Sequence, residues 1–157
     1  MKYRISITLF VLLILCSFTA CQDNQSLSRF RKEMDDFCDR IVVLDTSMNE
    51  VNPASETATE DLLVYLDELE LEFQRFAAVS FPEEFDYLEH LADDASTFMT
   101  DAVNAYHELF ASELYDDAQA TYAAETYSRA YKCIQMIITI MHGEEPNDPD
   151  FTIEYRS

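Results

Sequence analysis

The side chains in this 157-residue chain that could hold a metal or a cofactor are three histidines and a large set of carboxylates. A carboxylate-bridged metal pair in a helical bundle requires Glu-x-x-His on two of the helices. The residues three positions before His90, His107 and His142 are Tyr87, Asn104 and Thr139, so the motif is absent. No Cys-x-x-Cys-His haem attachment motif occurs either. We therefore expect no bound metal and no cofactor.

The residues suited to catalysis do not occur at the spacings of known catalytic motifs. A nucleophilic serine or cysteine needs a base and an orienting group beside it, and neither a nucleophile elbow nor a glycine-rich oxyanion loop occurs. Adjacent acidic residues on a helix diverge by about 100° and point to solvent, which applies to Asp35-Asp36, Asp93-Asp94 and Asp116-Asp117. The stretch NDPDFTIE lacks the ligand spacing and the glycine of a calcium loop. The chain is predicted not to be an enzyme.

Two of the four cysteines, Cys16 and Cys21, lie at the end of the most apolar stretch of the chain. Lys2 and Arg4 precede an apolar run over residues 5–18, and small and polar residues follow it. A positive start, a short apolar middle and a small residue before the break are typical of a secretory signal peptide. The competing interpretation is a retained transmembrane helix, which needs about 18 or more apolar residues to cross the bilayer. Because this run is shorter, we favour the signal peptide.

The residues that end this run, Phe18-Thr19-Ala20-Cys21, resemble the lipobox of bacterial lipoproteins, with Phe18 where leucine is usual. In that family the cysteine follows a small residue, carries the lipid and becomes the first residue of the mature chain. The resemblance implies that Cys21 bears a diacyl or triacyl anchor that includes palmitate. It also implies an extracytoplasmic protein, lipid-anchored to a bacterial membrane in the cell envelope. Cys16 is a poorer candidate, because the preceding Leu15 is too large.

The lipobox divides the chain into four parts. Residues 1–20 are the signal peptide, 21–25 a tether, 26–143 a folded domain and 144–157 a polar C-terminal tail. Residues 21–157 contain 8 basic and 31 acidic residues, a formal charge of −23. This charge repels phosphate backbones and anionic lipid, so we expect no nucleic-acid partner, and membrane binding must depend on the acyl chains. The same charge favours a basic partner or divalent cations.

Few helix breakers interrupt the chain, and apolar residues recur at alternating steps of three and four in four segments. The first stripe is Leu27, Phe30, Met34, Phe37, Ile41, Leu44 and Met48, and the second is Leu62, Leu66, Leu69, Phe73 and Phe76. The third is Phe85, Leu88, Ala92, Ala95, Met99, Ala102, Tyr106 and Leu109, and the fourth is Ala120, Ala123, Tyr127, Ala130, Ile134, Ile137 and Met141. Four helices with short connections predict an all-α fold, a four-helix up-down-up-down bundle that follows the signal peptide.

Two connections of the bundle have recognisable start signals. Thr57 and Glu60 have the spacing of a capping box at the start of the second helix, and Ser80 and Glu83 have it at the start of the third. The fourth helix is expected to stop at Gly143. Two prolines follow soon after it.

The boundary between the third and fourth helices has the weakest signal, because the stretch ASELYDDA contains neither glycine nor proline. One continuous helix of about 60 residues is possible. It would be about 90 Å long, and the first two helices would cover less than half of it. We therefore favour a turn over residues 112–116.

The segment KCIQMIITIM, residues 132–141, is apolar nearly all round its helix. If Ile134, Ile137 and Met141 face the bundle, Met136 points almost directly away and Ile140 points sideways at about 100° per residue. A helix that is apolar on all sides is usually covered by something. Met136 and Ile140 are therefore candidates for a contact patch toward another protein or a second copy. The alternative is a widened buried arc.

The remaining cysteines, Cys38 and Cys133, lie at matching heights in the first and fourth helices, about 18 and 15 Å from the same end. Disulfides persist in an extracytoplasmic compartment. The two residues lie on opposite flanks of their stripes, however, whereas antiparallel helices pair like flanks. We predict a Cys38–Cys133 disulfide, with two separate half-buried thiols as the alternative.

These observations predict a lipid-anchored envelope protein whose role is protein–protein contact or self-association. The alternative is a sensor or carrier that binds a small ligand or a cation in the bundle interior or on the acidic surface. Six alanines in the third and fourth helices would leave room for such a ligand, although alanines more often allow close helix packing: Ala92, Ala95, Ala102, Ala120, Ala123 and Ala130.

Overall fold

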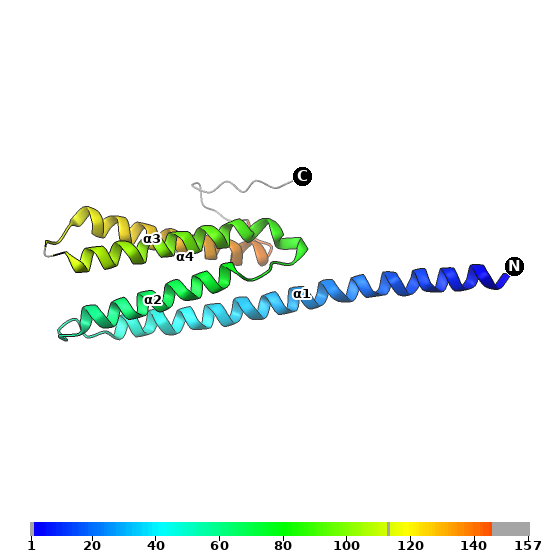
Figure 1. Cartoon of the computed structure of the whole chain (residues 1–157), viewed down its shortest axis with the longest axis horizontal. Coiled ribbons are helices and arrows are strands. Elements are labelled where there is room, and N and C mark those ends of the chain that lie inside the picture. The colour runs from blue at the N-terminus through cyan, green and yellow to red at the C-terminus, as the bar shows by residue number, and fades with distance from the viewer. Residues whose placement is uncertain (1, 113, 146–157) are drawn as a thin grey trace.

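The computed structural model describes the backbone of residues 2–112 and 114–145, and the side chains from residue 25 onward within those ranges. This part of the chain contains four α-helices and one 3₁₀ helix (Figure 1). They are α1 (Lys2–Glu50), α2 (Ala58–Ala77), η1 (Glu83–Leu88), α3 (Glu89–Ala111) and α4 (Asp117–Met141). The predicted all-α four-helix bundle is confirmed.

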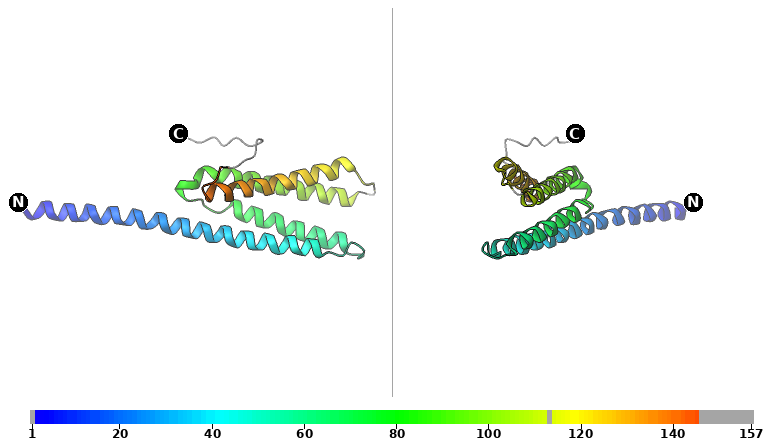
Figure 2. Two further views of the ribbon diagram at one scale, coloured as in Figure 1. Left: turned by 180° about the vertical axis from the view of Figure 1, so that it is seen from behind. Right: turned by 60° about the vertical axis from the view of Figure 1, so that its left-hand side comes forward.

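The helices run up and down in sequence order. The α1–α2 and α3–α4 connections lie together at one end of the bundle, and the α2–α3 connection lies at the other (Figure 1). The α1–α2 pair and the α3–α4 pair form two layers, and the first half of α1 projects beyond the bundle (Figure 2). We call the end that holds the two connections the distal end, because it is opposite the amino terminus.

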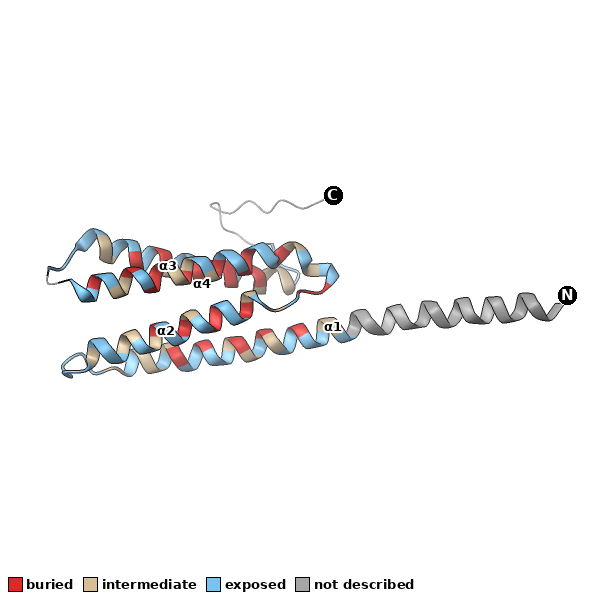
Figure 3. Ribbon diagram, viewed as in Figure 1, coloured by how far each residue is buried: buried red, intermediate tan, exposed pale blue. Residues whose placement is uncertain are grey.

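The buried face of α1 follows the predicted stripe, with Phe30, Met34, Phe37, Ile41 and Leu44 in the core. Buried residues line the inward faces of the helices in the same way along α2 and α3 (Figure 3). The helix also continues through residues 21–25, where we expected a tether. That segment contains no glycine or proline to interrupt the helix. Within the described part of the chain, no helix is both long enough and apolar enough to cross a membrane.

An aromatic cluster joins α1 to α2. The ring of Phe37 stacks on that of Phe76 with centroids 4.6 Å apart and meets the edge of Phe73 at 5.4 Å. Phe30 contacts Phe81, in the α2–α3 connection, at 4.4 Å. Because buried aromatic pairs stabilise a core beyond the area they bury, this cluster fixes how the first two helices pack.

Of the two predicted capping boxes, only the one at Thr57 coincides with a helix N-cap. Thr57 is the N-cap of α2 but makes no side-chain cap bond, and its hydroxyl donates to Asp61 at 2.8 Å. Pro82 precedes the 3₁₀ helix η1, and α3 begins only at Glu89. The start of α2 was thus predicted correctly, whereas α3 starts later than predicted because a 3₁₀ helix precedes it, and neither N-cap makes a side-chain cap bond.

The predicted turn between the third and fourth helices is confirmed. α3 ends at Ala111, and α4 begins after its N-cap Asp116, whose carboxylate accepts from the backbone N–H groups of Ala118 and Gln119 at 2.9 and 3.2 Å. A carboxylate at this position satisfies amides that lack helical partners and opposes the positive end of the helix dipole. Asp116 therefore fixes where α4 begins, in a connection that contains neither glycine nor proline.

The most extensive contact in the bundle is between α3 and α4. Five of the six alanines considered above are buried in it or beside it: Ala92, Ala95, Ala102, Ala123 and Ala130. Small residues let helix backbones approach closely. The alanines therefore serve close packing.

Helix α4 ends as predicted. Gly143 has φ of 75°, a left-handed conformation that glycine adopts without steric cost. The N–H of Gly143 donates to the carbonyl of Ile140 at 2.8 Å, and that of Glu144 to the carbonyl of Thr139 at 3.1 Å. The chain therefore turns sharply away from the helix axis at this point.

Candidate functional site

The predicted contact patch on α4 is wrong for Met136. Its side chain is 5% exposed and belongs to the hydrophobic core, while Ile140 is half-buried against that core. The buried face of α4 is centred near Cys133 and Ile137, both fully buried, and Met136 is only about 60° from Cys133 around the helix. The prediction had taken Ile134, Ile137 and Met141 as the inward face and left Cys133 out of it, which rotated Met136 outward.

The predicted disulfide is also absent, since Cys38 and Cys133 are both free thiols. Cys133 is fully buried, and burial together with the charge of Asp94 raises its pKa to about 11. Cys38 is half-buried on α1, where burial and then the charges of Asp35 and Asp39 raise its pKa. Cys38 and Cys133 agree in height along the bundle, but they lie on opposite flanks of the apolar stripes of α1 and α4, as helical geometry requires. Both thiols are protonated at neutral pH, and thiols in that state are poor nucleophiles.

Two predicted features lie outside the residues whose side chains are described. They are the lipid-bearing Cys21 and most of the polar tail, residues 146–157. Acylation of Cys21 stays a prediction from the lipobox.

Titratable side chains of α1, α2 and α3 pair with one another. Glu72 on α2 is 7% exposed and accepts hydrogen bonds from Arg40 on α1 and from Arg75 one turn later. His107 on α3 pairs with Asp67 on α2 at 2.7 Å on the surface. The described residues contain no group of three or more His, Cys, Asp and Glu side chains that could hold a metal ion.

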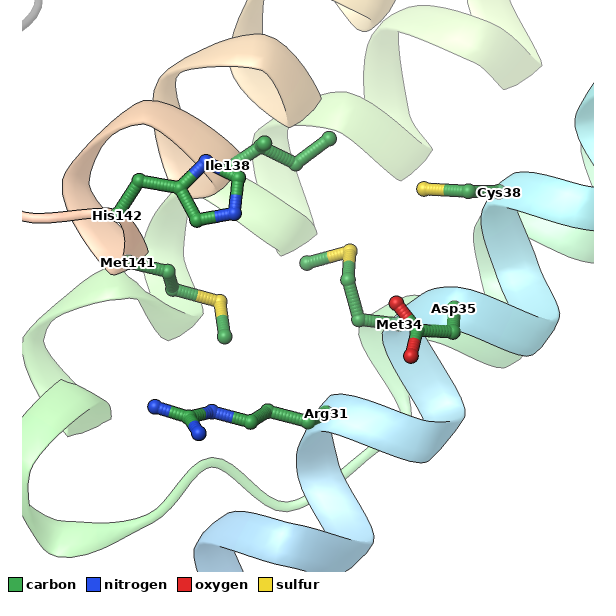
Figure 4. Close-up of a pocket in the computed structure, with 7 residues that line it drawn as sticks. All are labelled: Arg31, Met34, Asp35, Cys38, Ile138, Met141 and His142. Atoms are coloured by element: carbon green, nitrogen blue, oxygen red, sulfur yellow. The ribbon is translucent and has the colours of Figure 1, made fainter.

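An open groove of about 430 Å³ runs between α1 and α4 near the end of the bundle opposite the distal end. Seven side chains line it, and we call it the α1–α4 groove (Figure 4): Arg31, Met34, Asp35, Cys38, Ile138, Met141 and His142. The α1 and α4 backbones have far fewer close approaches than the other neighbouring pairs. The groove therefore lies where the bundle is least closed.

A group of exposed apolar side chains lies at the distal end. Leu114 and Tyr115 in the α3–α4 connection are 80% and 73% exposed, and Phe110 and Tyr122 on the flanking helices are also exposed. We call these four residues the distal tip. Single exposed apolar residues are ordinary on protein surfaces. Here, however, four of them belong to the end of the hairpin that α3 and α4 form.

The connection that carries the distal tip is well tied. The hydroxyl of Ser112 donates to the carbonyl of Leu114 at 2.8 Å and lies 3.2 Å from its amide nitrogen. Gln119 at the start of α4 donates to Glu108 on α3 at 3.0 Å. These bonds hold the backbone so that Leu114 and Tyr115 project into solvent.

Charge is unevenly distributed along the bundle. Residues 41–74 and 76–128 contain many acidic residues and no lysine or arginine, and both distal connections fall within these stretches. Three of the basic residues, Arg29, Arg31 and Lys32, lie at the opposite end, where α1 enters the bundle. The distal end therefore combines exposed apolar side chains with a large excess of carboxylates over lysine and arginine.

Sequence reasoning missed the distal tip although two signals were present. Leu114 and Tyr115 are large apolar residues within a turn that joins two helices, where no core position is available to them. The long stretches without lysine or arginine were equally visible. Comparisons of the chain with protein-family models, with curated proteins and with solved structures gave no match.

Proposed function

We propose that this protein is a lipid-anchored, non-catalytic module of the bacterial cell envelope that binds a basic protein partner through its distal tip. The observation that carries the proposal is the coincidence of exposed Leu114 and Tyr115 with two long stretches, residues 41–74 and 76–128, that contain no lysine or arginine. The membrane anchor is the acylated Cys21 expected from the lipobox.

The direction of α1 supports this arrangement. About 44 Å of helix separates the backbone of Cys21 from Glu50 at the distal end. An anchor at Cys21 would hold the basic residues of α1 near the membrane surface and the distal tip away from it. The tip would then be accessible to a protein facing the membrane.

The chemistry of the tip indicates the kind of partner. Tyrosine and phenylalanine are enriched at the centres of protein interfaces, because they bury much apolar area with little loss of side-chain entropy. Asp116, Asp117 and Glu108 surround the tip with negative charge that accelerates association with a positively charged surface and disfavours acidic partners. The partner surface should therefore carry an apolar pocket with lysine or arginine at its rim.

Photocrosslinking in the native envelope, with the full chain, tests the proposal. Benzoylphenylalanine in place of Tyr115 should crosslink one discrete partner, and the same probe in place of the exposed Glu84 at the opposite end should not. Binding of the purified partner should then weaken at least about tenfold in Leu114→Ser and fall as salt is raised. Val42→Ser, at another exposed apolar residue, on α1, is the control.

Three results would contradict the proposal. The first is equal crosslinking from positions 115 and 84. The second is a captured protein whose binding is unaffected by Leu114→Ser. The third is a partner with an acidic contact surface and affinity that does not depend on salt.

A further inference from the structure

The helices α1 and α2 form one layer of the bundle (Figure 2), and an open groove of about 590 Å³ runs between them. We call it the α1–α2 groove, and eight residues line it: Asp39, Arg40, Val43, Leu44, Glu68, Leu71, Glu72 and Arg75. Val43 is 63% exposed and Leu71 is 49% exposed, while Leu44 is buried. Leu71 points about 160° away from its buried neighbours Leu69 and Phe73, so the core of the bundle does not cover it.

The face around this groove extends along the whole of α2. Val64 lies seven residues before Leu71, on the same side of the helix, and is also 49% exposed. A second hollow of about 240 Å³, lined by Arg40 and Arg75 among others, continues the groove toward the α2–α3 connection. The 20 residues of α2 are about 30 Å long and two helices are about 20 Å wide, so the face covers about 600 Å². A standard interface buries about 800 Å² on each partner, so this face is large enough for a reversible protein contact.

The charges that line the α1–α2 groove are of both signs. The buried carboxylate of Glu72 accepts from Arg40 with one oxygen and from Arg75 with the other. The two arginine side chains remain 44% and 66% exposed, so part of each guanidinium group faces solvent. Asp39 and Glu68 line the same groove. The lining is therefore close to neutral, whereas the whole chain has a formal charge of −21.

This mixture of charges selects a second copy of the chain as the occupant. A basic partner would bind more strongly to the acidic stretches of the chain, and an acidic partner would be repelled by them. Two copies also repel each other over most of their surfaces. A two-fold contact brings together the same patch from both copies, so the patch must be complementary to itself. The α1–α2 groove meets this requirement, because exposed aliphatic side chains lie among arginines and carboxylates.

The contact between Arg40 and Glu72 sets the relative height of the two antiparallel helices. At a rise of 1.5 Å per residue, Val43 lies about 4.5 Å from Arg40 toward the distal end, and Leu71 lies about 1.5 Å from Glu72 in the same direction. Val43 and Leu71 therefore agree in height to about 3 Å. If a two-fold axis runs along the groove, α2 of one copy lies opposite α1 of the other at the same height. This rotation brings Leu71 of one copy to Val43 of the other.

We propose that two copies of this chain associate through the α1–α2 groove, about a two-fold axis parallel to the helices, with Leu71 of each copy against Val43 of the other. Arg75 and Asp39 also agree in height to about 3 Å, so the same rotation brings each Arg75 opposite an Asp39. Both copies point in the same direction, and both distal tips stay accessible. Either contact, the one through the groove or the one through the tip, can form without the other.

Two adjacent valines provide a matched pair of positions for photocrosslinking. Val42 and Val43 are 62% and 63% exposed, but they lie about 100° apart around α1, and of the two only Val43 lines the groove. Benzoylphenylalanine replaces one or the other in the full chain, which is expressed beside a second copy with a different tag. The probe at position 43 should give a covalent product that carries both tags. The probe at position 42 should give about tenfold less, because it points away from the groove.

Capture of one tagged copy by the other measures the association itself. Val43→Glu and Leu71→Glu each place a carboxylate in the apolar centre of the contact, so each should reduce co-capture at least about tenfold. Val42→Glu should leave it unchanged. All three substitutions are at exposed positions, and circular dichroism should show the same helix content in each variant.

Four results would overturn the proposal. They are a crosslink from position 43 to a different protein, equal dimer products from positions 42 and 43, no dimer product from position 43, and co-capture that neither Val43→Glu nor Leu71→Glu reduces. None of these results bears on the distal tip, which the probe at Tyr115 and Leu114→Ser test separately.

Discussion

Tyr131 on α4 donates a hydrogen bond from its hydroxyl to the carboxylate of Asp45 on α1 at 2.9 Å, and the hydroxyl of Tyr127 lies 3.2 Å from the same oxygen. The two tyrosines are 3.1 Å from each other. This polar group links the two helices that border the α1–α4 groove, toward the distal end from it. It compensates for the sparse backbone contact between them.

Loss of the Tyr131 hydroxyl should weaken this link. Tyr131→Phe is expected to lower the free energy of unfolding by about 1–2 kcal/mol, since a half-buried hydrogen bond to a charged acceptor is lost. Urea denaturation followed by circular dichroism measures the change. Tyr115→Phe, at an exposed tyrosine, should change stability by less than about 0.5 kcal/mol. Equal losses in the two variants would show that the Asp45 link contributes nothing.

The same tyrosines should make stability depend on alkaline pH. Burial, followed by the neighbouring Tyr127 hydroxyl and the Asp45 carboxylate, raises the pKa of Tyr131 far above its usual value, and burial likewise raises the pKa of Tyr127. In the unfolded chain both ionise near pH 10. The folded state therefore keeps its full stability below about pH 10 and loses it as pH rises further, because only the unfolded chain releases these protons.

A double variant tests this assignment. Tyr127→Phe combined with Tyr131→Phe should remove most of the decline in unfolding free energy between pH 9 and 11.5, with a residual slope from Tyr106, whose pKa burial also raises. If the double variant declines as steeply as the native chain, other groups govern the alkaline transition.

Met136 should behave as a core residue. Met136→Ala is expected to cost about 2–4 kcal/mol, since it removes a buried side chain and leaves a cavity. Gln135→Ala, at the preceding exposed position, should cost less than about 0.5 kcal/mol. Thermal and urea unfolding of the two variants give the comparison. If Met136→Ala were as stable as the native chain, the assignment of Met136 to the core would be wrong.

Cys21 should be the site of acylation. Cells that express the full chain with labelled palmitate should incorporate label into the native protein and into Cys16→Ala, and none into Cys21→Ala. The Cys21→Ala protein should also leave the membrane fraction, because the acyl chains supply the membrane affinity. Label retained in Cys21→Ala would refute the lipobox interpretation.

Much of the fold follows from local features of the sequence. The stripe of Phe30, Met34 and Phe37 identified the buried face of α1, because a period of 3.6 residues places such positions on one side of a helix. Gly143 marked the end of α4 because few other residues adopt its left-handed conformation without strain. The turn at residues 112–116 was predicted from the length of the neighbouring helices, and Asp116 provides its physical basis. Each of these inferences depends on contacts within one helix or on simple lengths.

The tertiary structure decided the features that depend on how neighbouring helices are rotated and spaced. The arc of α4 that is buried is set by the packing of α3 and by the approach of α1, so Met136 lies inside although its own sequence context favoured the outside. Cys38 and Cys133 have matching heights, yet the rotation of their helices leaves both thiols free. The α1–α4 groove lies where α4 is in extensive contact with α3 and in little backbone contact with α1. The spacing of apolar residues along one helix shows which of its faces is apolar. The distance and rotation between helices depend instead on side-chain volumes contributed by all four helices.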